Sequence, residues 1–488
     1  MRTLLTADHV LAHGSGGHHL LRDAAVVVRG DSIEWVGPRS AAPSGTDQRI
    51  DLGSSLLMPG LIDLDALSDI DHLILDSWWD AGQSARLRWS AEHFRTRRRH
   101  VLTPAERKTM RRYALAQLAL HGITTFMPIA SEIHSDWAES HDDFTDVAEV
   151  AGELGLRGFL GPSYRSGVNV TTAGGGRAIE FDDEEGRRGL ADAVRFLDTL
   201  QELGNPLLTG VLMPCRIETV REDLLAETAR VAAERDVLVR VHALQGLAER
   251  ELILEEKGIT PLELLERTGL LNDRLIIAHG VFLDIHSEVH GEDRGDLATL
   301  ATAGASIIHC PLTNTRYASH LQKLSRYLDA GVTVSLGTDS FPPDLIRGID
   351  AGIHVAQEQH GDLSAHLLAE YVNAATLGGA RALHRPDLGR IEAGAAADLA
   401  AFALDDFRAG PVEDPIRSLV LSGTGRDTRL TMVAGRVVSR DGAIPGVDLE
   451  ELRRAGQAVF DTLRAGYAAR DHRGGTVEEL FPPVFPIG

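Results

Sequence analysis

The sequence predicts an α/β protein in which a (β/α) barrel carries a small β-sandwich beside it. Three observations lead to this fold class. Strand-like apolar runs alternate with amphipathic helical stretches through the middle of the chain. Counted with the first of them, these runs number eight, which is the number that closes such a barrel. Short β-like segments also gather at both ends of the chain.

The two ends of the chain are expected to form the sandwich together. Near the N-terminus, the Arg-Gly-Asp at 29–31 separates two β-like segments as a hairpin turn would. Residues 397–403 and 430–438 repeat this style of sequence near the C-terminus. We therefore expect a β-sandwich over 1–57 and 396–445, a catalytic (β/α)8 barrel over 58–395, and a C-terminal helix with an extended tail over 446–488.

The middle of the chain supplies the barrel strands and helices. After the first strand, which begins at residue 58, the strand-like runs are residues 123–128, 158–161, 210–214, 237–242, 275–279, 305–309 and 332–339. The helix expected over 104–120 has Thr103 as its cap and Pro104 at its first position. A second clear amphipathic helix is expected over 221–234.

Four of these strands end on a side chain that can bind a metal or move a proton, namely His242, His279, His309 and Asp339. The carboxyl ends of the strands in a parallel barrel surround one cavity, so these side chains are expected to converge there. A single polar residue at a strand end is more often satisfied by nearby backbone groups. Four at equivalent positions favour a shared site.

Composition excludes several classes of partner. The chain has 71 acidic and 49 basic residues, a net charge of -22, which argues against binding to nucleic-acid phosphates. Its two cysteines, Cys215 and Cys310, cannot form a disulfide framework. The first residues lack the apolar core of a signal peptide, and no run approaches the roughly 18 apolar residues of a membrane helix. We expect a soluble cytoplasmic protein without a membrane partner.

Several motifs, taken in order along almost the whole chain, resemble those of the amidohydrolase superfamily, in the branch of cytosine deaminase and triazine hydrolase. They are EWVG at 34–37, MPGLID at 58–63, HGITT at 121–125, AHG at 278–280, IHCPLTN at 308–314, LGTDS at 336–340 and LGRIEAGAAADL at 388–399. The resemblance implies a distorted (β/α)8 TIM barrel with a β-sandwich, and one divalent metal ion that activates water by lowering its pKa from about 15.7 to about 7.

The resemblance also implies roles for particular residues. His242 matches the metal ligand of strand five, and Asp339 matches the strand-eight carboxylate that binds metal and accepts the proton of water. His279 matches the strand-six histidine that polarises the substrate. His309 and Asn314 lie where the strand-seven loop lines the substrate pocket in this family.

Three positions in two family motifs are altered. Relatives carry His-x-His on the first strand, where this chain has Asp65 and Leu67, and a leucine cannot bind a metal. The His-x-x-Glu of strand five ends here in Gln245, which can form hydrogen bonds but cannot titrate. The glutamate normally moves protons to and from a substrate nitrogen. Its loss argues against ring deamination, because ammonia must be protonated before it leaves.

Three interpretations remain open. A rebuilt site of Asp65, His242, His279 and Asp339 would hold one divalent ion, and its added hard oxygen would move the preference from zinc towards iron or manganese. Alternatively no metal binds, and Asp339 with His279 performs acid–base chemistry directly on the substrate. In the third interpretation the chain is an inactive relative that keeps its pocket for binding or its fold for assembly.

We expect an atypical hydrolase that cleaves a C–N bond in an amide, an amidine or an amino-substituted heterocycle. Asp339 would act as general base and His279 as electrophile, while Gln245, His309 and Asn314 would bind the substrate. A lyase or isomerase on the same fold and a non-catalytic binding protein are the alternatives. The expected partner is a small molecule, and a homodimer is an open alternative to a monomer.

The acidic loop at 68–72 adds polar groups after the first strand, and it is either part of the barrel mouth or a solvated connection. Glu132 and His134, after the second strand, are either pocket residues or loop surface. Trp78 and Trp79 either form the floor of an aromatic pocket or pack under a loop.

Overall fold

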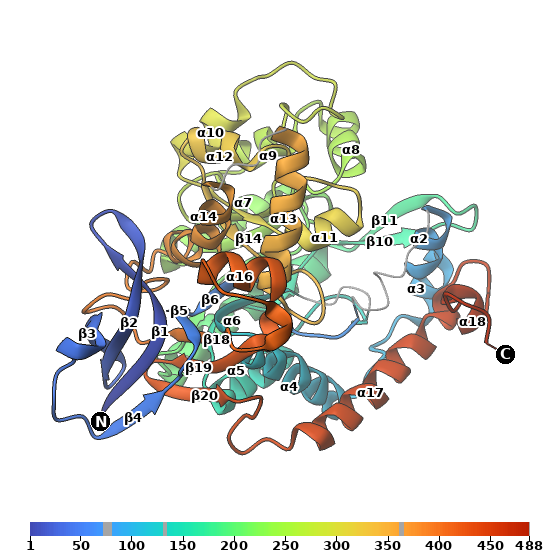
Figure 1. Cartoon of the computed structure of the whole chain (residues 1–488). Coiled ribbons are helices and arrows are strands. Elements are labelled where there is room, and N and C mark those ends of the chain that lie inside the picture. The colour runs from blue at the N-terminus through green and yellow to red at the C-terminus, as the bar shows by residue number, and fades with distance from the viewer. Residues whose placement is uncertain (72–80, 130–133, 361–365, 488) are drawn as a thin grey trace.

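The computed structural model (Figure 1) describes residues 1–71, 81–129, 134–360 and 366–487. Strands from both ends of the chain form one mixed sheet of eight strands, in the order β20-β19-β18-β5-β1-β2-β3, with β4 paired to β1. Their bounds are β1 Arg2–Gly14, β2 Gly17–Arg29, β3 Ser32–Pro38, β4 Gln48–Asp51, β5 Ser55–Pro59, β18 Leu399–Ala403, β19 Thr428–Val433 and β20 Arg436–Arg440. The two chain ends therefore share one β-rich unit.

The predicted hairpin at residues 29–31 is present between β2 and β3. Arg29 lies opposite Ser32, and Gly30 has a φ of 63°, a left-handed conformation that glycine adopts without strain. One face of the sheet is covered by apolar side chains from both ends of the chain, including Val26, Leu57, Leu399 and Leu430. This shared core explains why residues some 370 positions apart stay in one sheet.

The middle of the chain forms two parallel four-stranded sheets. The first has the order β12-β8-β7-β6, and the second has the order β14-β15-β16-β17. Their strands are β6 Leu61–Leu67, β7 Ile123–Ile129, β8 Arg157–Leu160, β12 Leu208–Gly210, β14 Val239–Ala243, β15 Leu275–His279, β16 Ser306–His309 and β17 Thr333–Leu336. Each predicted barrel strand is present, and the run at 210–214 is divided between β12 and β13 Met213–Pro214. The fold is a TIM-barrel-like α/β fold.

The two parallel sheets contact each other along both edges. Leu212 pairs with Val239 in a parallel bridge, and the backbone N–H of Asp339 donates to the carbonyl of Asp65 at 2.8 Å. Inward side chains of both sheets form one buried cluster, which includes Ile62, Met127, Phe159, Ile276 and Ile308. The strand ends that carry the predicted site residues therefore face one region.

Helices surround these sheets. They are α2 Ala81–Leu87, α3 Ala91–Arg97, α4 Pro104–Leu120, α5 His141–Leu154, α6 Asp183–Leu203, α7 Glu222–Arg235, α8 Leu247–Lys257, α9 Pro261–Arg267, α10 Asp296–Ala303, α11 Pro311–Arg316, α12 Leu324–Asp329, α13 Leu345–His360, α14 His366–Asn373, α15 Gly379–Ala382, α16 Pro415–Ser422, α17 Leu449–Gly466 and α18 Val477–Leu480. A short pair, β9 Ser163–Tyr164 with β13, and a hairpin, β10 Gly167–Thr171 with β11 Arg177–Phe181, complete the strands. Among the residues that the structure describes, no helix combines the length and apolar character needed to cross a bilayer.

The helix predicted over 104–120 begins and ends where expected. Thr103 accepts from the N–H of Glu106 at 3.3 Å, and the Glu106 carboxylate accepts from the N–H of Thr103 at 2.8 Å. This capping box satisfies two backbone donors at the start of α4. The long C-terminal helix α17 lies beside α4 (Figure 1).

A buried ion pair joins the parallel strands to the terminal sheet. Arg157, the first residue of β8, donates to both carboxylate oxygens of Asp398 at 2.8 and 3.1 Å. Asp398 also accepts from the backbone N–H of Ala434 at 2.8 Å. This bidentate ion pair orients the terminal sheet against the start of β8.

Candidate metal centre and active site

Strand β6, in the first parallel sheet, carries two buried carboxylates whose contacts differ. Asp63 accepts from the backbone N–H of Thr338 at 2.9 Å and from its hydroxyl at 2.6 Å. Burial raises the pKa of Asp63 to about 7. Asp63 therefore links β6 to the loop that follows β17. Asp65, two residues further along the strand, faces the cluster of predicted ligands.

The four residues predicted as metal ligands lie together. The Nε2 of His242 is 3.7 Å from Asp65 Oδ1, and the Nε2 of His279 is 3.9 Å from Asp65 Oδ2. Asp339 Oδ2 lies 3.8 Å from the same His279 nitrogen. These residues come from β6, β14, β15 and the loop after β17, and all four are buried. The convergence expected from the strand-end pattern is present for these residues.

Both imidazoles present the same nitrogen to the cluster. His242 Nδ1 lies 3.0 Å from the carbonyl oxygen of Cys215, and His279 Nδ1 lies 3.2 Å from Asn314 Oδ1. An Nδ1–H that donates to an oxygen leaves the lone pair on Nε2. Burial, followed by nearby arginines, lowers the pKa of His242 well below its usual value and that of His279 to about 3. Both rings are therefore neutral at pH 7, as metal ligands must be.

The backbone at the site is unusual. Leu244, His279 and Asp339 have φ values of 58°, 76° and 39°, in the left-handed region that non-glycine residues rarely occupy. Such conformations persist only where the surrounding structure holds them, and they cluster at active sites and ligand clamps. Close packing requires a glycine at position 337, because a Cβ there would lie 2.5 Å from the Cβ of Asp65.

The donor set fits one divalent ion. One ligand atom from each of Asp65, His242 and His279 lies within 4.8 Å of the other two. Two ligands held at ~2.1 Å from a tetrahedral zinc are ~3.4 Å apart. The distances from the two imidazoles to the nearer oxygen of Asp65, 3.7 and 3.9 Å, are a few tenths of an ångström longer. His279 Nε2 is buried and has no hydrogen-bond partner among the described residues, although two carboxylates lie close to it. A bound cation would satisfy this nitrogen.

Sequence analysis missed a cationic group in the same cluster. Arg240 donates from NH1 to Asp65 Oδ1 at 2.8 Å, and the two side chains are 2% and 0% exposed. The signal was available in the sequence, because Arg240 lies two residues before His242 on β14 and so points to the same face. The thiol of Cys310 also donates to Asp65, from 3.5 Å to Oδ2.

The other altered position of the first strand takes no part in the cluster. Leu67 is buried among apolar side chains that include Ile70, Ile129 and Phe341. It packs below the acidic loop, as a leucine should.

Gln245 lies at the half-buried edge of the site and contacts an arginine that sequence analysis did not select. Arg216 donates to Gln245 Oε1. The N–H groups of Leu244 and Gln245 donate to Glu249 at 2.6 and 3.2 Å. Burial and the neighbouring Glu218 raise the pKa of Glu249 to about 8. The carboxyl group of Glu249 therefore lies four residues after Gln245, but it already accepts hydrogen bonds from backbone N–H groups.

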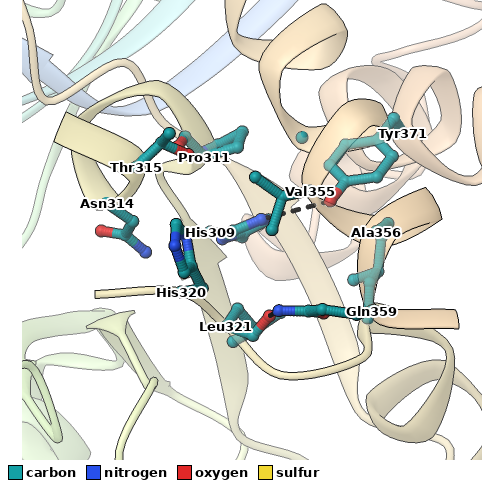
Figure 2. Close-up of a pocket in the computed structure, with 12 residues that line it drawn as sticks. His309, Pro311, Asn314, Thr315, His320, Leu321, Val355, Ala356, Gln359 and Tyr371 are labelled. Carbon is teal, nitrogen blue, oxygen red and sulfur yellow. Dashed lines mark hydrogen bonds between the residues drawn. The ribbon is translucent and has the colours of Figure 1, made fainter. Parts of the chain in front are cut away.

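His309 and Asn314 line a small cavity beside α11, α13 and α14, shown in Figure 2. His309 Nε2 lies 3.4 Å from the hydroxyl of Tyr371, and burial lowers the pKa of His309 to about 3. The cavity has a volume of about 10 Å³, which is room for one water molecule. That His309 and Asn314 bind the substrate stays a prediction.

The acidic loop after β6 is not a solvated connection. Asp71 lies 2.7 Å from His134 Nε2 and accepts from the Tyr467 hydroxyl at 2.5 Å, and all three residues are buried. The loop is thus held against the C-terminal segment. His72, Trp78, Trp79 and Glu132 lie outside the described residues.

Comparison with known proteins agrees with this geometry. The model of the Amidohydrolase family matches residues 56–438, which is most of the chain. The chain belongs to the amidohydrolase family. The predicted family is therefore confirmed.

Relatives of this amidohydrolase are deaminases. It is 30% identical over 453 residues to the 5-methylthioadenosine/S-adenosylhomocysteine deaminase of Halobacterium salinarum, covering 91% of this chain and 95% of that protein. It is 27% identical over 448 residues to the 8-oxoguanine deaminase of Pseudomonas aeruginosa, covering 90% and 95%. The expectation of a hydrolase that acts on non-peptide C–N bonds agrees with these activities.

Solved structures share its fold. A zinc-bound adenosine deaminase from Xanthomonas campestris superposes with a TM-score of 0.75 at 22% identity, over 95% of this chain and 98% of that one. The zinc complex of an atrazine chlorohydrolase from Arthrobacter aurescens gives 0.72 at 23% identity, over 94% and 100%. The cluster of Asp65, His242 and His279 supports the prediction of one divalent metal.

Proposed function

We propose that this amidohydrolase hydrolyses a C–N bond in a small amino-substituted nitrogen heterocycle, using one divalent metal ion. The observation that carries the proposal is the meeting of Asp65, His242, His279 and Asp339 at the ends of parallel strands. The substrate class follows from the relatives, whose names describe hydrolysis of amino groups on purines and their nucleosides. We also propose that residues 58–395 form a closed eight-stranded barrel, separate from the terminal sheet. The contacts between the two parallel sheets support this closure.

Asp65, His242 and His279 would hold the ion, with Asp339 beside them. A divalent ion at this position would supply a Lewis acid and a water of lowered pKa. Asp339, whose Oδ2 lies 3.8 Å from His279 Nε2, would accept a proton during hydrolysis and would later return it to the leaving nitrogen. Asn314 holds His279 in the tautomer that presents Nε2 to the centre.

The edge of the site would recognise the substrate. Gln245 and Arg216 form a linked pair at the half-buried mouth, and together they offer an amide and a fixed cation. Since Gln245 cannot carry a proton, Asp339 would serve both proton transfers. We therefore propose that ring deamination is slower than in relatives with the glutamate. Substrates whose leaving group depends less on protonation should be turned over faster.

The test combines metal analysis with a substrate panel. Protein purified without added metal is analysed for zinc, iron and manganese, and ammonia release is then measured on aminopurines, their nucleosides and amino-substituted pyrimidines. We expect about one metal ion per chain and turnover of at least one compound.

A pair of variants locates the chemistry. Asp339→Asn should lower turnover by 10²-fold or more, the scale of general acid–base catalysis. Asp344→Asn is the matched control, because both aspartates are 4% exposed but Asp344 accepts from backbone N–H groups of Gly425 and Arg347 instead. No metal and no turnover across the panel, or equal loss in both variants, would contradict the proposal.

A further inference from the structure

We propose that Arg240 is a built-in counter-ion of the metal centre, which shares Asp65 with the divalent ion and weakens the affinity of the site for it. This inference rests on the proposed function. The residue is neither a ligand nor a group that touches the reacting atoms, so its role is to set how tightly the site holds metal.

The contact itself is direct and enclosed. Arg240 NH1 donates at 2.8 Å to Asp65 Oδ1, the same oxygen that His242 Nε2 faces at 3.7 Å. Both side chains of the ion pair are almost completely buried. A guanidinium group cannot lose its proton in a protein, so the positive charge of Arg240 is permanent.

The charge balance of the site explains the effect. The triad Asp65, His242 and His279 offers one negative charge, which Arg240 already neutralises, and Asp339 adds a second carboxylate beside it. A dication that enters must share the carboxylate with a fixed positive charge in a region where water screens poorly. Removing that charge should therefore strengthen metal binding.

The same contact gives the Asp65 carboxylate a counter-charge from within the protein. A buried carboxylate that lacks a counter-charge is strongly destabilising, and Arg240 supplies that charge from β14. The Nε of Arg240 is buried without a hydrogen-bond partner among the described residues. A group with a purely structural task would more often have its donors satisfied.

Zinc titration of the metal-free protein tests the inference. The protein is stripped with a chelator, dialysed and titrated with zinc chloride in competition with a chelating dye. Arg240→Met keeps the apolar stem and removes the charge, and we expect it to bind zinc at least tenfold more tightly than the natural protein. Arg240→Lys retains a positive charge, and we expect its zinc affinity to lie within threefold of the natural value.

Arg157→Met is the matched control, because it breaks another buried arginine–aspartate pair, which joins β8 to Asp398. Its zinc affinity should be unchanged. The zinc-induced rise in melting temperature is a second readout that requires no substrate, and it should be larger for Arg240→Met than for the natural protein. If Arg240→Met does not fold, Arg240→Gln takes its place.

The outcomes separate the two proposals. Equal zinc affinity in the natural protein and the neutral variant, or weaker binding in the variant, overturns the inference and leaves the proposed function standing. Failure of both proteins to bind zinc or manganese overturns the inference and the metal-dependent function together.

Discussion

Thr338→Val removes the hydroxyl group that donates to Asp63 at 2.6 Å and leaves the shape of the side chain almost unchanged. The backbone N–H of Thr338 still donates at 2.9 Å, and the N–H of Asp65 at 3.2 Å. A hydrogen bond to a charged group contributes about 1.5–3 kcal/mol, and a neutral one about 0.5–1.5. Because burial raises the pKa of Asp63 to about 7, both forms are present near neutral pH. We expect a loss of about 2 kcal/mol in the free energy of unfolding.

Asp63→Ala should be more damaging. It leaves two buried backbone donors without an acceptor, each worth about 1–3 kcal/mol, so we expect a loss of about 4 kcal/mol. In the double variant the hydroxyl contact can be lost only once. The two single losses should therefore exceed the loss in the double variant by about 2 kcal/mol.

Urea unfolding followed by tryptophan fluorescence measures these differences, with a reversible transition required for each variant. Thr125→Val is the control, because the Thr125 hydroxyl is buried on β7 and has no hydrogen-bond partner among the described residues. It should be neutral or slightly stabilising. The reasoning is refuted if Thr338→Val lies within about 0.5 kcal/mol of the natural protein, or if the two single losses add within about 0.3 kcal/mol.

Three further outcomes are expected. Gly337→Ala places a Cβ 2.5 Å from that of Asp65, so it should cost about 1–3 kcal/mol and weaken zinc binding; unchanged values for both would contradict the close approach. Burial holds the pKa of Glu249 near 8 against a usual 4.5, so the folded state binds more protons between these values and stability falls as pH rises, by up to about 1.4 kcal/mol per pH unit. Urea midpoints at pH 5, 6.5 and 8 should show a flatter profile for Glu249→Gln, and parallel profiles would exclude the shift. Thr103→Ala should cost about 1 kcal/mol of unfolding free energy in the same assay, through loss of the α4 cap, whereas no change would show that Glu106 caps alone.

Much of the fold could be predicted because its signals are local. Apolar runs of strand length, separated by capped helices such as α4, follow from neighbouring residues alone. The meeting of His242, His279 and Asp339 could be predicted as well, because parallel strands in such a fold end at the same face. His309 ends its strand at an equivalent position, yet its ring packs towards Tyr371, since the residues beyond the strand decide where the side chain lies.

The positions of the strands along the chain, the family, and the meeting of His242, His279 and Asp339 could be predicted before the fold was known. How the charges of these side chains are balanced could not, because it depends on contacts between distant strands. Arg240 and Asp65 are 175 residues apart, and their pairing depends on which strands face each other across the interior. The division of tasks between Asp63 and Asp65 has the same origin, because a carboxylate takes its role from the donors that the folded chain places around it.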